Sequence, residues 1–509
     1  MTDRQGVPYD RGWAWMVVVG YFFSAFIMVG VGKSYGILMK PLMEEFHVDV
    51  TIASLGMAVS GAVYTITAPI FVTLGQHFTE RVIVIFGAIF GCCVISLCYF
   101  KFSIGYLIAL YGIGAGIGNA CLFGNGLVMI GNYFKRIRTI ANGVALSGAS
   151  VGTFAVPPLM EYLLQLYGLS GTYLILGGLY LMVAVSGALY RPVKFYTKNS
   201  LKRDDKHQLL NKGQSDSTQN GQTSKEDPTI TTFNCDEKND PLLNAEKELE
   251  SEEIEDEKLM SYISSTGSLV LGSVESLAQV VQAEEIKQPT RQNTVRICGK
   301  DIPKIFHFFV LKMPVVQFYT LFSFLVFFGY FNFVIFMPLD AVSRGYESFE
   351  KAWLVSCAGI GDLVGRIIVG LIGDLTIIER YKIIGAACIC CGLNILIFNF
   401  ATVFWWCAIH TTLYGFFGGA YVALTSIVLI DMVGLDIMPK ALGVILLIQG
   451  FGAAIGQPIE GSIRDFAGSY SPLNILNSSL MIIGGSIMFL YPLVRDFKKK
   501  QNQNGTASV

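Results

Sequence analysis

Long apolar runs constrain this chain more than any other feature of its sequence. Each run holds about 20 or more mostly apolar residues, the length that an α-helix needs to cross the hydrocarbon core of a bilayer. Twelve such runs follow one another, at roughly 13–38, 52–74, 82–100, 104–130, 139–162, 171–190, 313–337, 353–373, 382–400, 404–432, 441–463 and 473–495. The sequence therefore predicts an all-α membrane protein with twelve transmembrane helices in two six-helix bundles.

The composition agrees with a lipid environment. Hydrophobic residues make up 52% of the 509 residues and charged residues only 15%, whereas soluble proteins carry about 25% charged residues. The formal net charge of −1 gives no basis for a nucleic-acid partner. The first apolar run, which starts at Trp13, is too long for a cleavable signal peptide, so we expect it to remain as a membrane span.

A long polar segment separates the two sets of runs. Residues 191–304 include an acidic run from Glu246 to Glu257. Such a composition cannot bury a core, so we expect this segment to be disordered, and a short surface helix at Ser268–Ile286 is the alternative to a plain linker. The expected organisation is an N-terminal bundle at 1–190, a central loop at 191–304, a C-terminal bundle at 305–495 and a tail at 496–509.

Basic residues are unevenly distributed between the two sides of the predicted bundles. The side with few of them has Lys40, Lys101, Arg344, Lys351 and Arg464. The other side has many more, in the loops after the second, fourth, sixth and eighth runs and near both termini. Because cytoplasmic loops carry an excess of Lys and Arg, both termini and the central loop are predicted to be cytoplasmic. No retention or organelle signal appears, so we expect the plasma membrane.

Cysteine, histidine and glycine give no sign of a metal site or a nucleotide-binding site. Nine of the eleven Cys lie in apolar runs, where Cys packs as a small hydrophobe, and the five His are scattered. Gly112, Gly114, Gly116 and Gly118 lie inside a predicted span with no strand before them, so they are expected to allow close helix packing. The sequence thus predicts no cofactor, no metal and no enzymatic activity.

Three ionisable residues lie inside the predicted spans and are candidates for function, because charged groups are costly in hydrocarbon. Lys33 lies about twenty residues into the first span, and Asp362 and Arg366 lie four residues apart in the middle of the eighth. That spacing places Asp362 and Arg366 on one helix face, where they can pair. The planar guanidinium of arginine can bind a carboxylate through two parallel hydrogen bonds, and a buried lysine exchanges its proton readily.

Structural explanations compete with these functional ones. For Asp362 and Arg366, the alternative is a salt bridge that serves only helix packing. For Lys33, the alternative is a side chain that extends to the outer surface. Glu161, Asp431 and Glu460 lie nearer the ends of their spans, so each is expected at a solvated helix end.

Several motifs resemble the monocarboxylate transporter family. The first, Asp10-Arg11-Gly12-Trp13-Ala14-Trp15, is similar to the family's Asp-Gly-Gly-Trp-Gly-Trp signature, with Arg11 and Ala14 in place of glycines. The segment from Tyr133 to Gly148 resembles the signature of the fifth span. Asp362-x-x-x-Arg366 matches the eighth span, and Lys33-Ser34 follows Trp15 at the family spacing. These motifs cover both predicted bundles.

The resemblance implies a major facilitator fold and proton-linked or facilitated transport of small carboxylates by alternating access. It implies that Arg366 holds the substrate carboxylate, that Asp362 orients Arg366 and assists proton coupling, and that Lys33 couples the proton to the anion. Asn142 is expected to face the cavity. Tyr64 and Tyr421 match pocket-lining aromatic positions, with ordinary helix packing as the alternative. Some relatives need a single-span immunoglobulin-like ancillary protein to reach the cell surface.

Other functions remain open at this point. Some relatives are proton-independent carriers of aromatic amino acids, iodothyronines, creatine or carnitine, while retention of Lys33 favours a proton-linked monocarboxylate carrier. A non-transporting nutrient sensor is a third hypothesis, which the short predicted tail disfavours. The sequence does not name the substrate.

Overall fold

The computed structural model describes residues 10–134, 138–191, 294–297, 300–303, 308–374, 378–434 and 437–495. Residues 192–293 lie outside this set, and with them most of the predicted central loop and the alternative helix at Ser268–Ile286. The tail at 496–509 also lies outside it. Residues 10–191 and 268–509 cluster as one compact unit, which contains every described helix.

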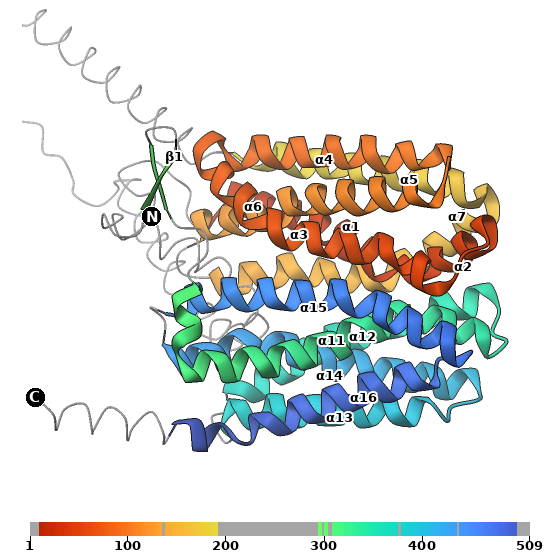
Figure 1. The fold of residues 1–509 in the computed structure, drawn as a ribbon. Helices are drawn as coiled ribbons and strands as arrows, with labels where there is room; N and C mark the ends of the chain where they lie inside the picture. Colours follow the sequence, from red (N-terminus) through yellow and green to blue (C-terminus); the bar gives the residue numbers. More distant parts are fainter. Residues whose placement is uncertain are drawn as a thin grey trace, which may run out of the picture. The chain divides into compact units, whose positions relative to one another are not determined.

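The first half of the described chain folds into one bundle of helices, drawn from red to yellow in Figure 1. Its helices are α1 (Trp13–Lys33), α2 (Tyr35–Phe46), α3 (Val50–Phe78), α4 (Glu80–Leu97), α5 (Ile104–Ala109), α6 (Gly116–Tyr133) and α7 (Arg138–Leu189). A short π-helix, Leu110–Ala115, joins α5 to α6, so that these three pieces form one span.

The second half forms the other bundle, drawn from green to blue in Figure 1. Its helices are α11 (Pro314–Ser343), α12 (Ser348–Asp374), α13 (Arg380–Phe398), α14 (Phe404–Val433), α15 (Met438–Ala467) and α16 (Ser471–Met488). Helix α7 of the first bundle packs against α12 of the second, and α3 packs against α15.

The number of spans agrees with the twelve predicted from the sequence. Ten helical segments in the described residues are long and apolar enough to cross a membrane. One of them contains two helices, because α7 is interrupted at Gly168, whose φ of 62° and ψ of −170° are not helical. Helix α16, with 18 residues, lies at the position of the twelfth predicted run and is not one of those ten segments. The predicted all-α membrane fold is therefore confirmed.

Close approach between helices explains the glycines that the sequence placed inside spans. A Cβ atom built on Gly112 would lie 2.7 Å from a methyl carbon of Val59, and one on Gly116 would lie 2.8 Å from the Ser60 carbonyl oxygen. Both glycines let the fourth span approach α3. The expected packing role is confirmed at these positions.

Two short strands lie where the sequence predicted only a disordered loop. β1 (Thr294–Ile297) pairs with β2 (Lys300–Pro303) in an antiparallel register that places Thr294 opposite Pro303. The hydrophobic pattern of this polar segment did not predict the pairing.

Candidate functional site

Lys33 is the last residue of α1, and its side chain reaches the second bundle. Its Nζ lies 3.5 Å from the hydroxyl oxygen of Tyr330 and 5.7 Å from the centre of the Tyr330 ring. Tyr330 belongs to α11 and is only 4% exposed. The ammonium group thus points toward the interface between the two bundles, so the alternative of a side chain that extends to the outer surface is not what the structure has.

Asp362 and Arg366 pair on one face of α12, as their spacing predicts. Arg366 donates from Nε to Asp362 Oδ2 over 3.1 Å and from Nη2 to Oδ1 over 3.2 Å. The Asp362 side chain is 2% exposed and the Arg366 side chain is 11% exposed. Burial in a medium of low polarity makes such a pair mutually dependent, because loss of either partner leaves an uncompensated charge.

Ser150 of α7 brings the first bundle to the same carboxylate. Its Oγ donates to Asp362 Oδ2 over 2.6 Å, so this oxygen is shared by a hydroxyl from one bundle and a guanidinium from the other. Asp362 also attracts Lys33 electrostatically, while Arg366 repels it. Lys33, Asp362 and Arg366 therefore form one electrostatic cluster at the bundle interface, with an excess of one positive charge when Lys33 is protonated.

Arg366 keeps part of its hydrogen-bonding capacity. Within the described residues, Nη1 has no hydrogen-bond partner, whereas Nε and Nη2 are both bound to Asp362. The Arg366 guanidinium can therefore donate hydrogen bonds from Nη1 to an anion while Nε and Nη2 stay bound to Asp362.

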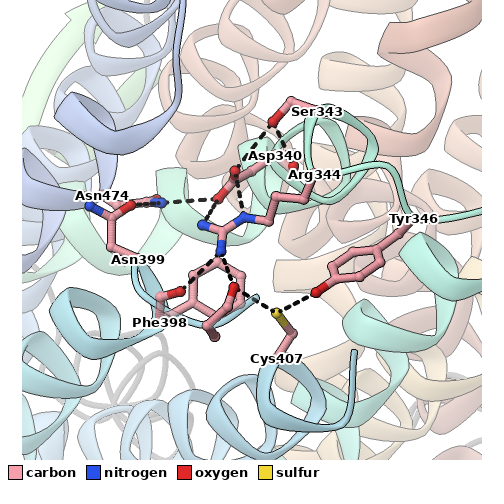
Figure 2. Close-up of polar contacts among 9 residues, drawn as sticks. Asp340, Ser343, Arg344, Tyr346, Phe398, Asn399, Cys407 and Asn474 are labelled. Atoms are coloured by element: carbon pink, nitrogen blue, oxygen red, sulfur yellow. Dashed lines mark hydrogen bonds and ion pairs between the residues drawn. The ribbon is translucent and has the colours of Figure 1, made fainter. Parts of the chain in front are cut away.

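A second aspartate and arginine with the same four-residue spacing provide a comparison (Figure 2). Arg344 donates from Nε and Nη2 to Asp340, but its Nη1 donates to the carbonyl oxygens of Phe398 and Ala401 over 3.2 and 2.6 Å. Asn474 of α16 donates to the same Asp340 carboxylate over 3.0 Å. Arg344 thus ties the end of α11 to the segment between α13 and α14, and all three of its guanidinium nitrogens are engaged.

The remaining predicted site residues differ in how close they come to this cluster. Tyr421 is 2% exposed, lies with its ring 6.0 Å from that of Tyr330, and accepts a hydrogen bond from Gln449 over 3.2 Å. Tyr64 contacts Phe123 within its own bundle, with ring centres 6.5 Å apart, and no described contact joins it to Lys33 or Arg366. The structure therefore brings Tyr421 to the cluster and leaves Tyr64 outside it.

Asn142 lies on α7 two turns before Ser150, roughly 12 Å away along the helix axis. Its side chain is fully buried, at 0% exposure. Among the described residues, neither its Oδ1 nor its Nδ2 has a hydrogen-bond partner. A buried amide without partners is unusual, since buried polar groups are nearly always satisfied.

Two of the three acids expected at solvated helix ends are buried instead. Glu161 and Lys351 form an ion pair of 3.0 Å, with side chains 3% and 4% exposed, and Glu460 is 0% exposed. The prediction was wrong for Glu161 and Glu460 because residues of other helices bind them: Glu161 pairs with Lys351 of α12. Glu460 accepts hydrogen bonds from Asn332 of α11 and Asn477 of α16. Asp431 is 47% exposed in its pair with Arg380, as expected.

Polar contacts join the two bundles near one end of the molecule, and we call this region the joined end. There Lys351 of α12 pairs with Glu161 of α7. Asp465 of α15 accepts from the backbone N–H groups of Val50 and Thr51, at 3.2 and 2.9 Å, and from the Thr51 hydroxyl at 2.6 Å. These contacts involve the beginning of α3 and the last turns of α15.

Comparison with known sequences places this architecture in a family. The sequence profile of the Major Facilitator Superfamily matches residues 21–251 and 319–508, which is most of the chain. The chain belongs to the major facilitator superfamily. As a member, it is a multi-pass membrane transporter and not an enzyme.

Curated relatives of this facilitator are named monocarboxylate transporters, in agreement with the resemblance drawn from its motifs. Monocarboxylate transporter 12 of Xenopus laevis is 26% identical over 500 residues, covering 97% of this chain and 91% of the relative. Monocarboxylate transporter 12-B of Danio rerio is 26% identical over 518 residues, covering 99% and 92%. Monocarboxylate transporter 14 of Homo sapiens is 26% identical over 502 residues, covering 97% and 93%.

Tyr330 and Ser150 are the members of the cluster that sequence reasoning missed. Tyr330 lies 297 residues from Lys33, and Ser150 lies 212 residues from Asp362. Ser150 does lie near the segment from Tyr133 to Gly148 that resembles the family's fifth-span signature, and that proximity was the one available signal.

Proposed function

We propose that this facilitator carries small monocarboxylates, of the lactate, pyruvate and ketone-body class, together with a proton by alternating access. The observation that carries the proposal is Arg366, buried at the bundle interface, held by Asp362 through two nitrogens and unbound at the third within the described residues. A carboxylate that binds Nη1 there would also lie in the field of Lys33.

Charge counting supports coupling to a proton. With Lys33 protonated, the two cations and Asp362 leave an excess of one positive charge, and a bound monocarboxylate makes the cluster neutral. When the anion leaves, the excess charge returns to a poorly solvated site, where it is costly. Release of a proton from Lys33 removes it, so the loaded and the empty clusters are both neutral. Because Asp362 interacts with Lys33 electrostatically, the proton belongs to the coupled cluster rather than to one residue.

The other predicted residues take supporting roles in this proposal. Tyr421 would line the substrate position beside Tyr330, and Asn142 would offer its unsatisfied amide to the substrate or to water on the far side of Ser150. Tyr64 stays a prediction, since it contacts Phe123 in the present arrangement.

The proposed orientation in the membrane follows from the distribution of basic residues. Both termini and the central loop 191–304 face the cytoplasm, the joined end faces outward, and the protein resides in the plasma membrane. The helical bundles at 1–190 and 305–495 would move relative to each other during transport. A single-span immunoglobulin-like ancillary protein is the proposed partner for reaching the surface.

The test is uptake of labelled solutes by cells that express the chain, at acidic and alkaline external pH. The panel contains lactate, pyruvate, a ketone body, an aromatic amino acid, creatine and carnitine. We expect monocarboxylate uptake to rise with an inward proton gradient and to carry no electrical current. Uptake of an amino acid, creatine or carnitine that ignores pH would replace this proposal with a proton-independent carrier.

Lys33→Gln tests the coupling step itself. Without an amine to protonate, the variant lacks the group that balances the substrate charge, so proton-driven uptake is expected to disappear while surface expression is unchanged. Surface biotinylation provides the control for expression. Uptake that responds to pH as in the wild type would exclude Lys33 from the coupling step.

A further inference from the structure

Glu460 is a buried acid that the proposed transport cycle does not use. It lies on α15 and is 0% exposed. Its Oε1 accepts from Nδ2 of Asn332 on α11 over 2.9 Å, and its Oε2 accepts from Nδ2 of Asn477 on α16 over 3.0 Å. In the described part of the chain it forms no ion pair, in contrast to Glu161 and Asp362.

Charged groups on the helices that pack against α15 are engaged elsewhere. α15 packs against α3, α11, α14, α16 and the short helix at Phe308–Lys312. Besides Glu460, the charged residues of α15 and of these elements are, in the described chain, Lys312, Asp340, Asp431, Lys440, Arg464 and Asp465, and the other titratable groups are Cys407, His410, Tyr64, Tyr319, Tyr330, Tyr414 and Tyr421. Asp340 pairs with Arg344, and Asp465 pairs with Arg464. Arg464 lies one turn after Glu460 on α15 but pairs with Asp465, and no described residue forms an ion pair with Glu460. An ionised carboxylate at Glu460 would therefore be a buried charge without an ion-pair partner.

Unsatisfied oxygen atoms surround this acid. The amide oxygens of Asn332, Asn477 and Gln457 are buried and, among the described residues, accept no hydrogen bond. Asn332 and Asn477 are the two residues that hold the Glu460 carboxylate, and Gln457 lies one turn before it on α15. The unsatisfied atoms of these three amides are thus all acceptors, and an additional donor could satisfy one of them.

A proton on Glu460 would satisfy one of these acceptors. If the side-chain amide of either asparagine is flipped by 180°, its oxygen and nitrogen exchange places. The amide oxygen then lies 2.9 Å (Asn332) or 3.0 Å (Asn477) from the Glu460 carboxyl group. That distance matches a hydrogen bond from a carboxylic acid to an amide oxygen. A metal cation fits less well. The carboxylate of Glu460 and each asparagine amide are only 2.9 or 3.0 Å apart, which leaves no space for an ion between a carboxylate oxygen and an amide oxygen.

We propose that Glu460, Asn332 and Asn477 form a proton-binding site that is separate from the Lys33 cluster and is occupied while the joined end is closed. Glu460 lies five positions before Asp465 on α15, roughly 7.5 Å along the helix from the contact with α3. Gly461, the next residue, packs against Thr51, so the same turn of α15 contacts the other bundle. Separation of the bundles at this end would admit water to Glu460 and allow the proton to leave.

Infrared spectroscopy of the purified full-length protein in lipid nanodiscs, without substrate, tests the site. We expect a carboxylic-acid C=O stretch at neutral pH that disappears in Glu460→Gln, persists in Lys33→Gln and persists in the matched control Glu44→Gln, whose carboxylate is 68% exposed. A spectrum of Glu460→Gln identical to the wild type would overturn the proposal. If that variant does not accumulate, Glu460→Asp takes its place. The acid band should then shift in frequency, and an unshifted band counts against the site.

Thermal melting across a pH series gives a second, independent readout. A proton bound only in the folded protein stabilises it at low pH, and this stability is lost as rising pH removes the proton. The melting temperature of the wild type should therefore fall as pH rises, and it should fall by a smaller amount in Glu460→Gln. Parallel melts in sodium chloride and choline chloride address the remaining alternative: stabilisation by sodium that requires Glu460 would assign the site to a metal cation and reject the proton. Neither measurement depends on what the chain transports.

Discussion

Arg344 and Arg366 occupy the same position in the same Asp-x-x-x-Arg motif, yet their surroundings assign them different roles. Each is bound by an aspartate one turn earlier on its helix. Arg344 uses its third nitrogen to bind two backbone carbonyls and so fastens neighbouring helices together, whereas the third nitrogen of Arg366 has no partner within the described residues. The difference between the structural role of Arg344 and the proposed binding role of Arg366 is therefore the donor that Arg366 leaves unused at Nη1.

Arg366→Lys tests this difference. Lysine keeps the charge but cannot hold Asp362 and a carboxylate with a planar fork. The loss of one charge-assisted hydrogen bond, about 1.5–3 kcal/mol, predicts a KM for substrate roughly tenfold to a hundredfold higher at unchanged surface level. Arg344→Lys is the matched control, expected to lower thermal stability and to leave KM unchanged. An unaltered KM in Arg366→Lys would show that the guanidinium does not bind substrate.

Part of this site could be predicted from the sequence, and the reason is local. Asp362 and Arg366 pair within one helix turn, and a spacing of four residues is enough to predict that contact. Contacts between helices are different, because periodicity does not say which faces meet. Tyr330 and Ser150 are ordinary residues of apolar spans, and only the fold brings them to Lys33 and Asp362.

At the scale of helices, apolar length predicted the spans well and their ends poorly. α12 begins at Ser348, earlier than the predicted run at 353–373, so Lys351 lies inside a helix rather than in a loop. A polar residue near the end of an apolar run looks solvated in the sequence, because hydrophobicity does not reveal a partner on another helix. Glu161 finds that partner in Lys351, on the other bundle.

The Glu161–Lys351 pair can be tested by a double-mutant cycle. Lys351→Met leaves the buried Glu161 carboxylate without its cation and is expected to destabilise the protein by about 3–5 kcal/mol. Adding Glu161→Met should restore most of that loss, because no charge then remains unpaired. Thermal melts in detergent measure both effects.

An exposed pair supplies the control for this cycle. Lys101 pairs with Glu45, whose side chain is 46% exposed, so Lys101→Met should cost at most about 1 kcal/mol. Equal effects of Lys351→Met and Lys101→Met would contradict the buried-pair interpretation.

For the molecule as a whole, the joined end must open if transport proceeds by alternating access. The Thr51 and Ser462 hydroxyl oxygens lie 3.3 Å apart across the two bundles. The double variant Thr51→Cys with Ser462→Cys, treated with a short thiol cross-linker, should lose uptake and recover it when a cleavable linker is reduced. Each single variant under the same treatment is the control. Full uptake by the cross-linked protein would mean that this contact persists through the cycle.

Orientation in the membrane is a second property of the whole molecule. Because basic residues gather on one side, epitope tags inserted at residue 220 and at the C-terminus are expected to be reached by antibody only after cells are permeabilised. A tag in the 344–347 loop, at the joined end, should be reached in intact cells. The reverse pattern of labelling would invert the proposed topology.

Helix α3 begins without a cap of its own. Asp49 precedes it, but the Asp49 side chain makes no capping hydrogen bond, and the first N–H groups of the helix are instead bound by Asp465 of the other bundle. A helix capped by its neighbour is complete only while that neighbour is in place. Each separation of the joined end would therefore expose the first turn of α3 to fraying. This facilitator would then alternate between a longer and a shorter helix as well as between two arrangements of rigid bundles.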